Sequence, residues 1–362
     1  MRLNPYVEQA ELVSPFIAPE TLAAEAGTLL RLRLGANESL FGPSPLALAA
    51  MKDAAEIAML YGDPRSAELR TALSASLGVS PDELIFESGI DGLLSLICRS
   101  LLSAGDVAVQ SQGGYPVVPF VLRPLGAKLV TVPYREDGLN DLDALVEAAH
   151  KSDAKLVYLS NPDNPSGTFF RAPEIKQFHD ALPEGCMLIL DEAYSEFAPP
   201  EELLPFQTSG RLIRLRTFSK AYGMAGARLG YGIANSRLVG HLEKLRMHFN
   251  LNRIAQAGAL AAYCDQAYLR QVVERVAEGR EFLYQMSGRL GLEHIVSSTN
   301  FVCIRLESAA QSLDVVTKLL KRGVFVRRPW SAPLDSCIRV SVAPLPMLEE
   351  FEPELQAVLS EG

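Results

Sequence analysis

Between residues 82 and 217 the sequence repeats one pattern, in which short apolar runs alternate with loops and amphipathic helices. Apolar runs of roughly four to eight residues bounded by turns are typical of buried strands, and strands that alternate with helices build a mainly parallel sheet with helices on both faces. The runs are ELIFESG, DVAVQ, AKLVTVPY, KLVYLS, CMLIL and RLIRLR. The pattern therefore predicts an α/β fold whose large domain has a mainly parallel sheet flanked by helices.

The segments on either side of residues 82–217 show a different pattern of helices and strands. Prolines break up residues 1–35, where we expect an arm, a short helix and a strand at 30–34, and two helices follow, the second ending at Gly78. After residue 240, helices expected at 241–250, 253–264 and 266–291 precede three shorter strands, NFVCIRL, VFVRR and CIRVSV. We therefore expect an arm that belongs partly to the small domain at 1–35, a large domain at 36–250 and a small α+β domain at 251–362.

Charge and cysteine usage exclude several classes of function. The formal net charge of -9 argues against a nucleic-acid backbone as the main partner, although a local arginine cluster could still attract an anionic small molecule. Neither the five scattered cysteines nor the five scattered histidines have the spacing of a metal site, and the cysteines suggest a reducing compartment. The sequence shows no secretory signal and no apolar run long enough to span a membrane. We expect a cytoplasmic protein without a metal.

Chemically distinctive side chains follow the predicted strands. In a doubly wound sheet, ligands bind at the carboxyl ends of the strands, so these side chains should meet. They are Gly89, Ile90 and Asp91 at a helix start, then Tyr115, Asn164, Asp191, Tyr194, Thr217, Ser219, Lys220 and Arg228. A lysine amine can form a Schiff base with an aldehyde cofactor, while hydroxyls and a guanidinium can hold a phosphate. Alone, Lys220 could be a surface lysine after an edge strand, but the whole set indicates a site.

The order and spacing of these motifs carry a family resemblance. The motifs are ANESLFGPSP, YGD, ESGID, YP, NPDNPSG, DEAY, TFSKAYGMAGARLGY and CIRVSV, spread over about residues 30–345. The chain resembles fold-type I pyridoxal-phosphate enzymes and, within them, the histidinol-phosphate aminotransferase-like group. The resemblance implies a pyridoxal 5'-phosphate-dependent aminotransferase of histidine biosynthesis. Its substrates would be histidinol phosphate or a related, for example aromatic, amino acid, with 2-oxoglutarate and glutamate as the other pair.

The resemblance also implies a role for each cofactor-site residue. Lys220 would hold the cofactor and move the substrate's α-proton, and Asp191 would keep the pyridine nitrogen protonated. Tyr194 and Asn164 would bind the cofactor's phenolate oxygen, and Tyr115 would stack on its ring. The backbone N–H groups of Ile90 and Asp91, which follow Gly89, would bind its phosphate. The side chains expected around that phosphate are Thr217, Ser219 and Arg228. Tyr61 would reach that phosphate from a neighbouring subunit, which implies a homodimer with shared sites.

The implied substrate site is less regular. Arg339 matches the arginine that binds the substrate's α-carboxylate in a bidentate pair, and Arg327 or Arg328 could bind a second anionic group. Asn37 retains the first position of the family's NENP motif, whose last two positions are serine and leucine here. Phe16 stands where the family often has a tyrosine that helps to bind the substrate phosphate. Specificity for histidinol phosphate is therefore open.

Two other functions remain as alternatives. One is a decarboxylase resembling threonine-phosphate decarboxylase, whose fold and motifs are the same. The other is a non-catalytic ligand-binding protein built on this fold. Lys220, Asp191 and Arg228 are all present, which argues against the non-catalytic alternative.

Overall fold

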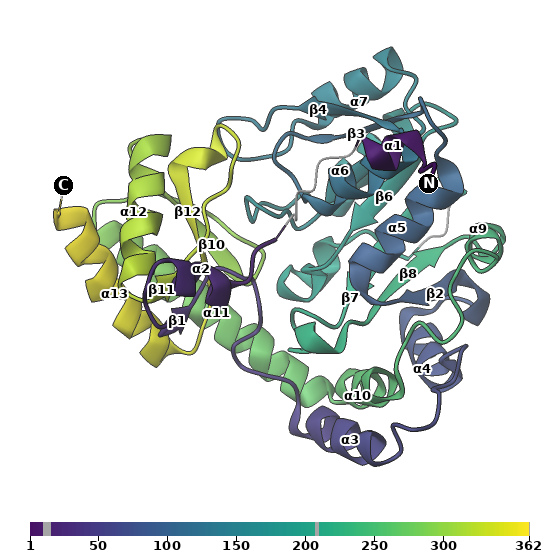
Figure 1. Cartoon of the computed structure of the whole chain (residues 1–362), viewed down its shortest axis with the longest axis horizontal. Coiled ribbons are helices and arrows are strands. Elements are labelled where there is room, and N and C mark those ends of the chain that lie inside the picture. Colours follow the sequence, from purple (N-terminus) through teal and green to yellow (C-terminus); the bar gives the residue numbers. More distant parts are fainter. Residues whose placement is uncertain (10–15, 207–209, 362) are drawn as a thin grey trace.

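A mainly parallel sheet forms the centre of the large domain in the computed structural model, which describes residues 1–9, 16–206 and 210–361 (Figure 1). Within these residues seven strands pair in one sheet. Their order is β2 (Leu84–Glu87), β8 (Gly230–Ala234), β7 (Leu212–Thr217), β6 (Met187–Asp191), β5 (Leu156–Ser160), β3 (Val107–Ser111) and β4 (Lys128–Val132). Only β8 runs antiparallel to its neighbours, so the predicted fold class is confirmed.

Both faces of this sheet are buried. Along β5, Leu156 and Tyr158 belong to one apolar cluster, while Val157 and Leu159 belong to another. The first cluster includes side chains of α5 (Gly89–Leu101), α6 (Val117–Leu122) and α9 (Ser236–Leu242), and the second includes those of α7 (Leu142–Lys151) and α8 (Ala172–Ala181). Because successive strand residues point to opposite faces, two buried faces explain why these strands are apolar throughout.

A smaller α+β part lies beside the sheet (Figure 1). Its strand β10 (Phe301–Arg305) pairs antiparallel with β9 (His294–Ile295) and β12 (Cys337–Ser341), next to α12 (Ala309–Lys321) and α13 (Leu345–Ser360). Near the N-terminus, β1 (Leu32–Arg33) pairs with β11 (Val324–Phe325), and α2 (Pro19–Glu25) contacts α12. By contrast, α1 (Pro5–Glu8) contacts residues 123–125 of the large part, so the N-terminal segment touches both parts.

The long helix α11 (Gln266–Arg289) leads from the large part to the small part (Figure 1). The preceding helix, α10 (Arg253–Cys264), follows the expected boundary at residue 250, yet it packs against α3 (Pro45–Glu56) and α4 (Ala67–Leu77). Because α10 shares a buried cluster with residues of β2 and β8, we propose that the large domain extends through α10 and that the boundary lies near the start of α11.

Some expected local structure is wrong. The helix α6 and the strand β8 were not among the elements expected from the sequence. A Cβ on Gly230 would lie 2.9 Å from the carbonyl carbon of Gly89, so the glycine lets this strand pass close to the start of α5. The expected helix at 241–250 is also wrong, because α9 ends at Leu242 and turns follow. Cys264 is exposed, unlike the other four cysteines.

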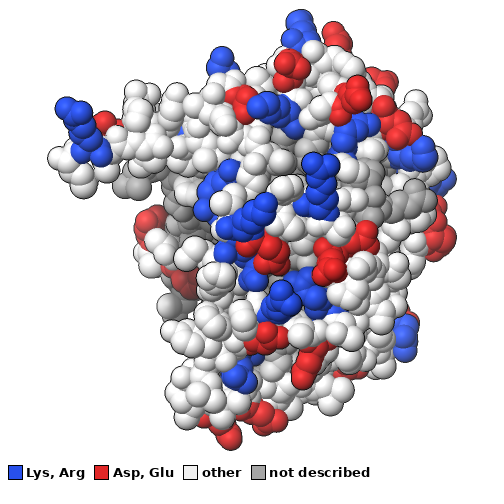
Figure 2. Space-filling view, turned by 90° about the vertical axis from the view of Figure 1, so that its right-hand side faces the viewer, with Lys and Arg blue, Asp and Glu red and all other residues white. Residues whose placement is uncertain are grey.

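Basic and acidic side chains are interspersed on the face shown in Figure 2, without a continuous basic stripe. In the described ranges, no helix combines the length and the apolar character that crossing a membrane requires. The same ranges contain no group of three or more histidine, cysteine, aspartate or glutamate side chains arranged to hold a metal ion.

Candidate active site

A cavity of about 520 Å³ lies at the carboxyl ends of β5, β6 and β7. The start of α5, segment 16–19, segment 35–38 and the small part also contribute to its wall. Of the predicted site residues, those that line it are Phe16, Asn37, Ile90, Asp91, Tyr115, Asn164, Asp191, Tyr194, Thr217, Ser219, Lys220, Arg228, Arg327 and Arg339. The topology therefore brings together side chains that are up to 323 positions apart in the sequence, counted from Phe16 to Arg339 (339 − 16).

Lys220 stands in the turn after β7, and its amine points into this cavity. The Lys220 Nζ donates to the backbone oxygen of Asn37 at 2.9 Å and lies 5.4 Å from the centroid of the Tyr194 ring. Asn37 in turn donates from Nδ2 to the Tyr194 hydroxyl at 3.0 Å. Its backbone is in the left-handed region, with φ of 53°, and its Oδ1 is buried without a partner among the described residues. Asn37 thus orients both the lysine and the phenol.

Asp191 is a buried carboxylate at the end of β6. Its Oδ2 accepts a hydrogen bond from the Tyr158 hydroxyl at 2.7 Å, and its Oδ1 accepts one from the backbone N–H of Ala193 at 3.0 Å. Burial raises the pKa of Asp191 to about 6, against the effect of these hydrogen bonds. A buried carboxylate in this position is stabilised by a cationic ligand group.

Helix α5 begins at Gly89, whose φ of 80° favours glycine. A Cβ at Gly89 would lie 2.7 Å from Nη2 of Arg228, so only a glycine lets this guanidinium approach the helix start. Ser219 and Thr217 face the same region, and the Thr217 hydroxyl donates to the Ser219 hydroxyl at 2.9 Å. A helix N-terminus with a guanidinium and two hydroxyls is suited to an anion such as phosphate.

Asp91 lies within the first turn of α5, whose N-cap residue is Ser88. Its carboxylate lies 3.4 Å from Arg228 and accepts a hydrogen bond from the Tyr115 hydroxyl at 2.7 Å. Burial, followed by the nearby Asp91 charge, raises the pKa of Tyr115 well above its ordinary value. Tyr115 is therefore a neutral ring fixed in the cavity wall.

Two arginines of the small part, Arg339 and Arg327, face the cavity. Arg339 on β12 is 8% exposed, donates to Asn164 Oδ1 at 2.6 Å, and leaves its Nε without a partner among the described residues. Arg327 donates to the backbone oxygen of Gly35 at 3.3 Å. Burial lowers the pKa of both, that of Arg327 to about 10 with a contribution from Arg339. No described carboxylate lies within 4.0 Å of either guanidinium, so this end of the cavity is suited to an anionic ligand.

Three predicted site residues lie outside this cavity. Gly89 lies under Arg228, as described above. Arg328 lines a neighbouring cavity of about 170 Å³ together with Phe16, Tyr115 and Trp330, and its Nη2 lies 3.7 Å from Asp335. Tyr61 is 77% exposed, stacks on Phe249 at 4.6 Å between ring centroids, and lines a separate surface cavity.

The sequence interpretation missed other residues that line the cavity. Tyr158 lies inside a strand, whereas we considered only residues after strand ends. Its position two residues before Ser160, on the same face of β5, could have revealed it. Arg33 and Glu38 also line the cavity and form an ion pair, and Arg33 pairs with Glu20 of α2 as well. No sequence signal identified that cluster.

Comparison with known proteins relates this arrangement to one family. The model for aminotransferase class I and II matches residues 31–351. Histidinol-phosphate aminotransferase 2 of Carboxydothermus hydrogenoformans is 38% identical, covering 99% of this chain and 97% of that protein, and histidinol-phosphate aminotransferase of Bacillus velezensis is 35% identical over 100% and 99%. The crystal structure of histidinol-phosphate aminotransferase from Sinorhizobium meliloti with pyridoxal-5'-phosphate superposes with a TM-score of 0.96 at 40% identity, covering 99% of this chain and 98% of that chain.

Proposed function

Since the chain belongs to the aminotransferase class I and II family, we propose that it transfers an amino group from histidinol phosphate, or from a related aromatic amino acid, to 2-oxoglutarate. The enzyme is a pyridoxal-phosphate-dependent aminotransferase, and the substrates are the proposed part. Transamination of histidinol phosphate would place the enzyme in histidine biosynthesis. The observation that supports the substrate class best is the pair of arginines in the cavity that holds Lys220, Arg339, which is buried, and Arg327, which is half-buried. Neither guanidinium has a carboxylate partner among the described residues.

The residues of the cavity fit the cofactor. Asp191 supplies a buried carboxylate for the ring nitrogen, and Lys220 supplies an amine for covalent attachment. The start of α5 with Gly89 and Arg228 forms a cradle suited to the phosphate group. When bound, pyridoxal phosphate supplies a carbonyl carbon that takes up the amino group and a ring that accepts electrons from the substrate's α-carbon.

The chain's own residues would bind and orient the reactants. Lys220, once released from the cofactor, would act as a general base that takes the proton from the substrate's α-carbon and then as a general acid that gives it to another carbon. The backbone oxygen of Asn37 holds this amine within the cavity. Tyr194 presents a hydroxyl for the cofactor's phenolate oxygen, and Asn164 presents the amide nitrogen that its bond to Arg339 leaves free. Tyr115 would pack against the ring.

The two arginines have distinct expected partners. Arg339 would bind the α-carboxylate of glutamate or 2-oxoglutarate through two parallel N–H donors. Arg327 would bind the second carboxylate of these acids. Histidinol phosphate has no carboxylate, so its phosphate would bind Arg327 or share Arg339. Arg328 is less suited to this role, because it lies near Asp335 and lines only the neighbouring cavity. That cavity, with Phe16, Tyr115 and Trp330 in its wall, could accept a ring-shaped side chain.

The two alternatives receive less support. The relatives reported above are named as aminotransferases, and nothing in the comparisons favours the decarboxylase. Lys220 and Asp191 share the cavity with the phosphate cradle, which is the arrangement a catalyst needs and a non-catalytic binding protein does not.

A half-reaction screen tests the proposal. Purified enzyme loaded with pyridoxal phosphate is mixed with histidinol phosphate, phenylalanine, tyrosine or glutamate in the absence of a 2-oxo acid, and absorbance is followed. A donor that is used converts the cofactor to its amine form, whereas decarboxylation would release carbon dioxide and leave the aldehyde form. Lys220→Ala is the control, and borohydride reduction followed by peptide mapping should place the cofactor on Lys220. A label on another lysine, or conversion by none of these donors, would contradict the proposal.

We also propose a homodimer and a cytoplasmic location. Tyr61 and its chain neighbours Met59 and Leu60 are 77%, 80% and 56% exposed, and Tyr61 stacks on Phe249, which is 44% exposed. Large apolar side chains that lie together at the surface favour a protein interface. All five cysteines are free, which supports a reducing compartment.

A further inference from the structure

Tyr158 contacts Asp191 from the neighbouring strand. In the parallel pair β5 and β6, Tyr158 lies opposite Ile189 and Ser160 lies opposite Asp191. Side chains two positions apart on a strand point to the same face, so Tyr158 and Asp191 are diagonal neighbours on one face of the sheet. The Tyr158 hydroxyl donates to Oδ2 of Asp191 at 2.7 Å, the usual length of an O–H···O hydrogen bond.

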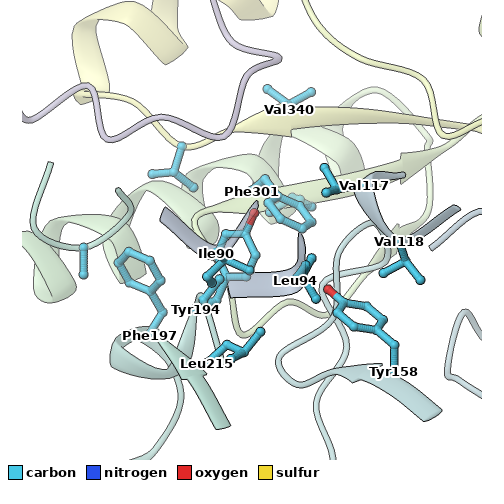
Figure 3. Close-up of a cluster of buried hydrophobic side chains, with 14 of the residues drawn as sticks. Ile90, Leu94, Val117, Val118, Tyr158, Tyr194, Phe197, Leu215, Phe301 and Val340 are labelled. Carbon is cyan, nitrogen blue, oxygen red and sulfur yellow. The ribbon is translucent and has the colours of Figure 1, made fainter. Parts of the chain in front are cut away.

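Both partners are fixed by their surroundings. Tyr158 and Asp191 are each 4% exposed. Figure 3 shows the Tyr158 ring among buried apolar side chains that include Leu94 and Val118, with its hydroxyl pointing toward the middle of the cluster. Because the ring is packed on its sides, the hydroxyl has one position, and the carboxylate it contacts is held at one orientation.

The charge on Asp191 depends on a small set of neighbours. Burial disfavours the ionised carboxylate, and so does the negative Asp91 on α5. The hydrogen bonds from Tyr158 and from the backbone of Ala193, together with the positive Lys220, favour the ionised form, and Tyr158 has the largest favourable effect. Tyr115, neutral and bonded to Asp91, also faces this carboxylate.

We propose that Tyr158 is a positioning residue for Asp191, and that its hydroxyl keeps the carboxylate ionised so that the shared proton stays on the ring nitrogen of the bound cofactor. This inference rests on the proposed function, in which Asp191 faces that nitrogen. A carboxylate can accept about four hydrogen bonds, so the bonds from Tyr158 and Ala193 leave room for the ring N–H. Without the hydroxyl, the buried carboxylate would lose its strongest donor, and the proton would move to Asp191.

The position of this proton can be measured by ¹⁵N NMR of enzyme loaded with pyridoxal phosphate labelled at the ring nitrogen. The wild type should give the signal of a protonated nitrogen, and Tyr158→Phe should shift it toward the signal of a neutral nitrogen. We also expect kcat to fall by roughly tenfold or more, as for the loss of a hydrogen bond to a charged group, with KM changed much less.

Tyr134→Phe is the matched control. Tyr134 is also buried, at 5% exposure, and its hydroxyl lies 3.2 Å from both carboxylate oxygens of Asp163, away from Asp191. This variant loses the same kind of bond, so it should lose similar stability while its ring nitrogen stays protonated. Should Tyr158→Phe fail to fold, Tyr158→Met removes the same hydroxyl with a more adaptable side chain.

The possible outcomes separate this inference from the proposed function. A protonated ring nitrogen in both Tyr158 variants would overturn the inference and leave the proposed function intact. An equal shift in Tyr134→Phe would also overturn it, because the effect would then be one of packing. A wild type that binds no pyridoxal phosphate would overturn both. A shift confined to the Tyr158 variants would support the role of this hydroxyl.

Discussion

At the scale of single residues, Asp191 shows how a site residue can lower the stability of the chain that carries it. Its pKa is about 6 in the folded protein, against a reference value of 3.8. Between these values the folded state binds more protons than the unfolded state, so the free energy of unfolding falls as pH rises from about 4 to about 6 and stays lower above that. At neutral pH the cofactor-free protein therefore carries a penalty from this buried charge.

Asp191→Asn should remove this penalty. We expect the cofactor-free variant to exceed the wild type in unfolding free energy by about 2–3 kcal/mol at pH 7, and to match it near pH 4, where the wild-type carboxyl is protonated. Urea denaturation at the two pH values measures the difference. If the variant and the wild type were equally stable at both pH values, burial would not destabilise the ionised form of Asp191. The same variant should also lose most activity, since an amide cannot keep the ring nitrogen protonated.

Arg339 is a buried arginine whose Nε has no hydrogen-bond partner among the described residues. Arg339→Lys should weaken glutamate and 2-oxoglutarate by roughly 2–5 kcal/mol, because a lysine cannot present two parallel donors to a carboxylate. Steady-state KM values for both acids measure the loss. Arg305→Lys on the neighbouring strand β10 is the control, since Arg305 lies outside the cavity and bonds to the backbone of Glu136. Equal effects of the two substitutions would argue against a carboxylate at Arg339.

At the scale of elements, the sequence was informative where one local pattern decided the structure. Apolar runs predicted β5, β6 and β7, and their carboxyl ends predicted most of the cavity wall. The strand β8 was missed because its glycines, Gly230 and Gly232, resemble a loop. Their Cβ atoms would come within 2.9 Å of Gly89 and 3.0 Å of Ile85. That requirement for close packing depends on the assembled sheet, which a local pattern does not contain.

The same reason explains which site residues were found and missed. Lys220 and Asp191 follow strands directly, so the topology alone places them. Tyr158 was missed because it lies inside β5, although the alternation of side chains along the strand could have revealed it. Arg33 enters the cavity through contacts between segments that only the folded chain brings together. Phe16 lies in the cavity wall, with its ring centroid 6.1 Å from that of Tyr115.

Trp330 connects two loops beside the neighbouring cavity. Its indole Nε1 donates to the backbone oxygen of Gly113 at 3.0 Å, on the loop that carries Tyr115. Trp330→Phe keeps an aromatic wall but loses this bond. We expect KM for an aromatic donor or histidinol phosphate to rise several-fold, as for the loss of one ordinary hydrogen bond, with a smaller change for glutamate. Because Trp330 is the only tryptophan, its fluorescence in the wild type should also change when these donors bind. Equal KM changes for all donors would exclude a role in side-chain selection.

At the scale of the whole molecule, the site is assembled from parts that could move relative to one another. Lys220, Asp191 and the phosphate cradle belong to the large part, whereas Arg339 and Arg327 belong to the small part. A substrate carboxylate on Arg339 would therefore bridge the two, and its binding energy could favour a closed arrangement. Asn37 already joins them, since its backbone N–H donates to Ser341 of β12 and its oxygen accepts from Lys220.

Tyr61 is expected to act in a site that two copies of the chain form together. It lies outside its own chain's cavity, at the surface beside Phe249, so a role in phosphate binding requires the site of a second copy. A heterodimer of a Lys220→Ala chain and a Tyr61→Phe chain would contain one site with both defects and one site with neither. That intact site should give about half the activity of a wild-type dimer and more than either parent dimer, measured on heterodimers separated by two different affinity tags.

Tyr6→Phe, a change in an exposed tyrosine on α1, replaces Tyr61→Phe in the control mixture. If Tyr61 acted within its own chain, the only site that keeps Lys220 would also carry Phe in place of Tyr61, and the heterodimer would be no more active per intact lysine than the Tyr61→Phe parent.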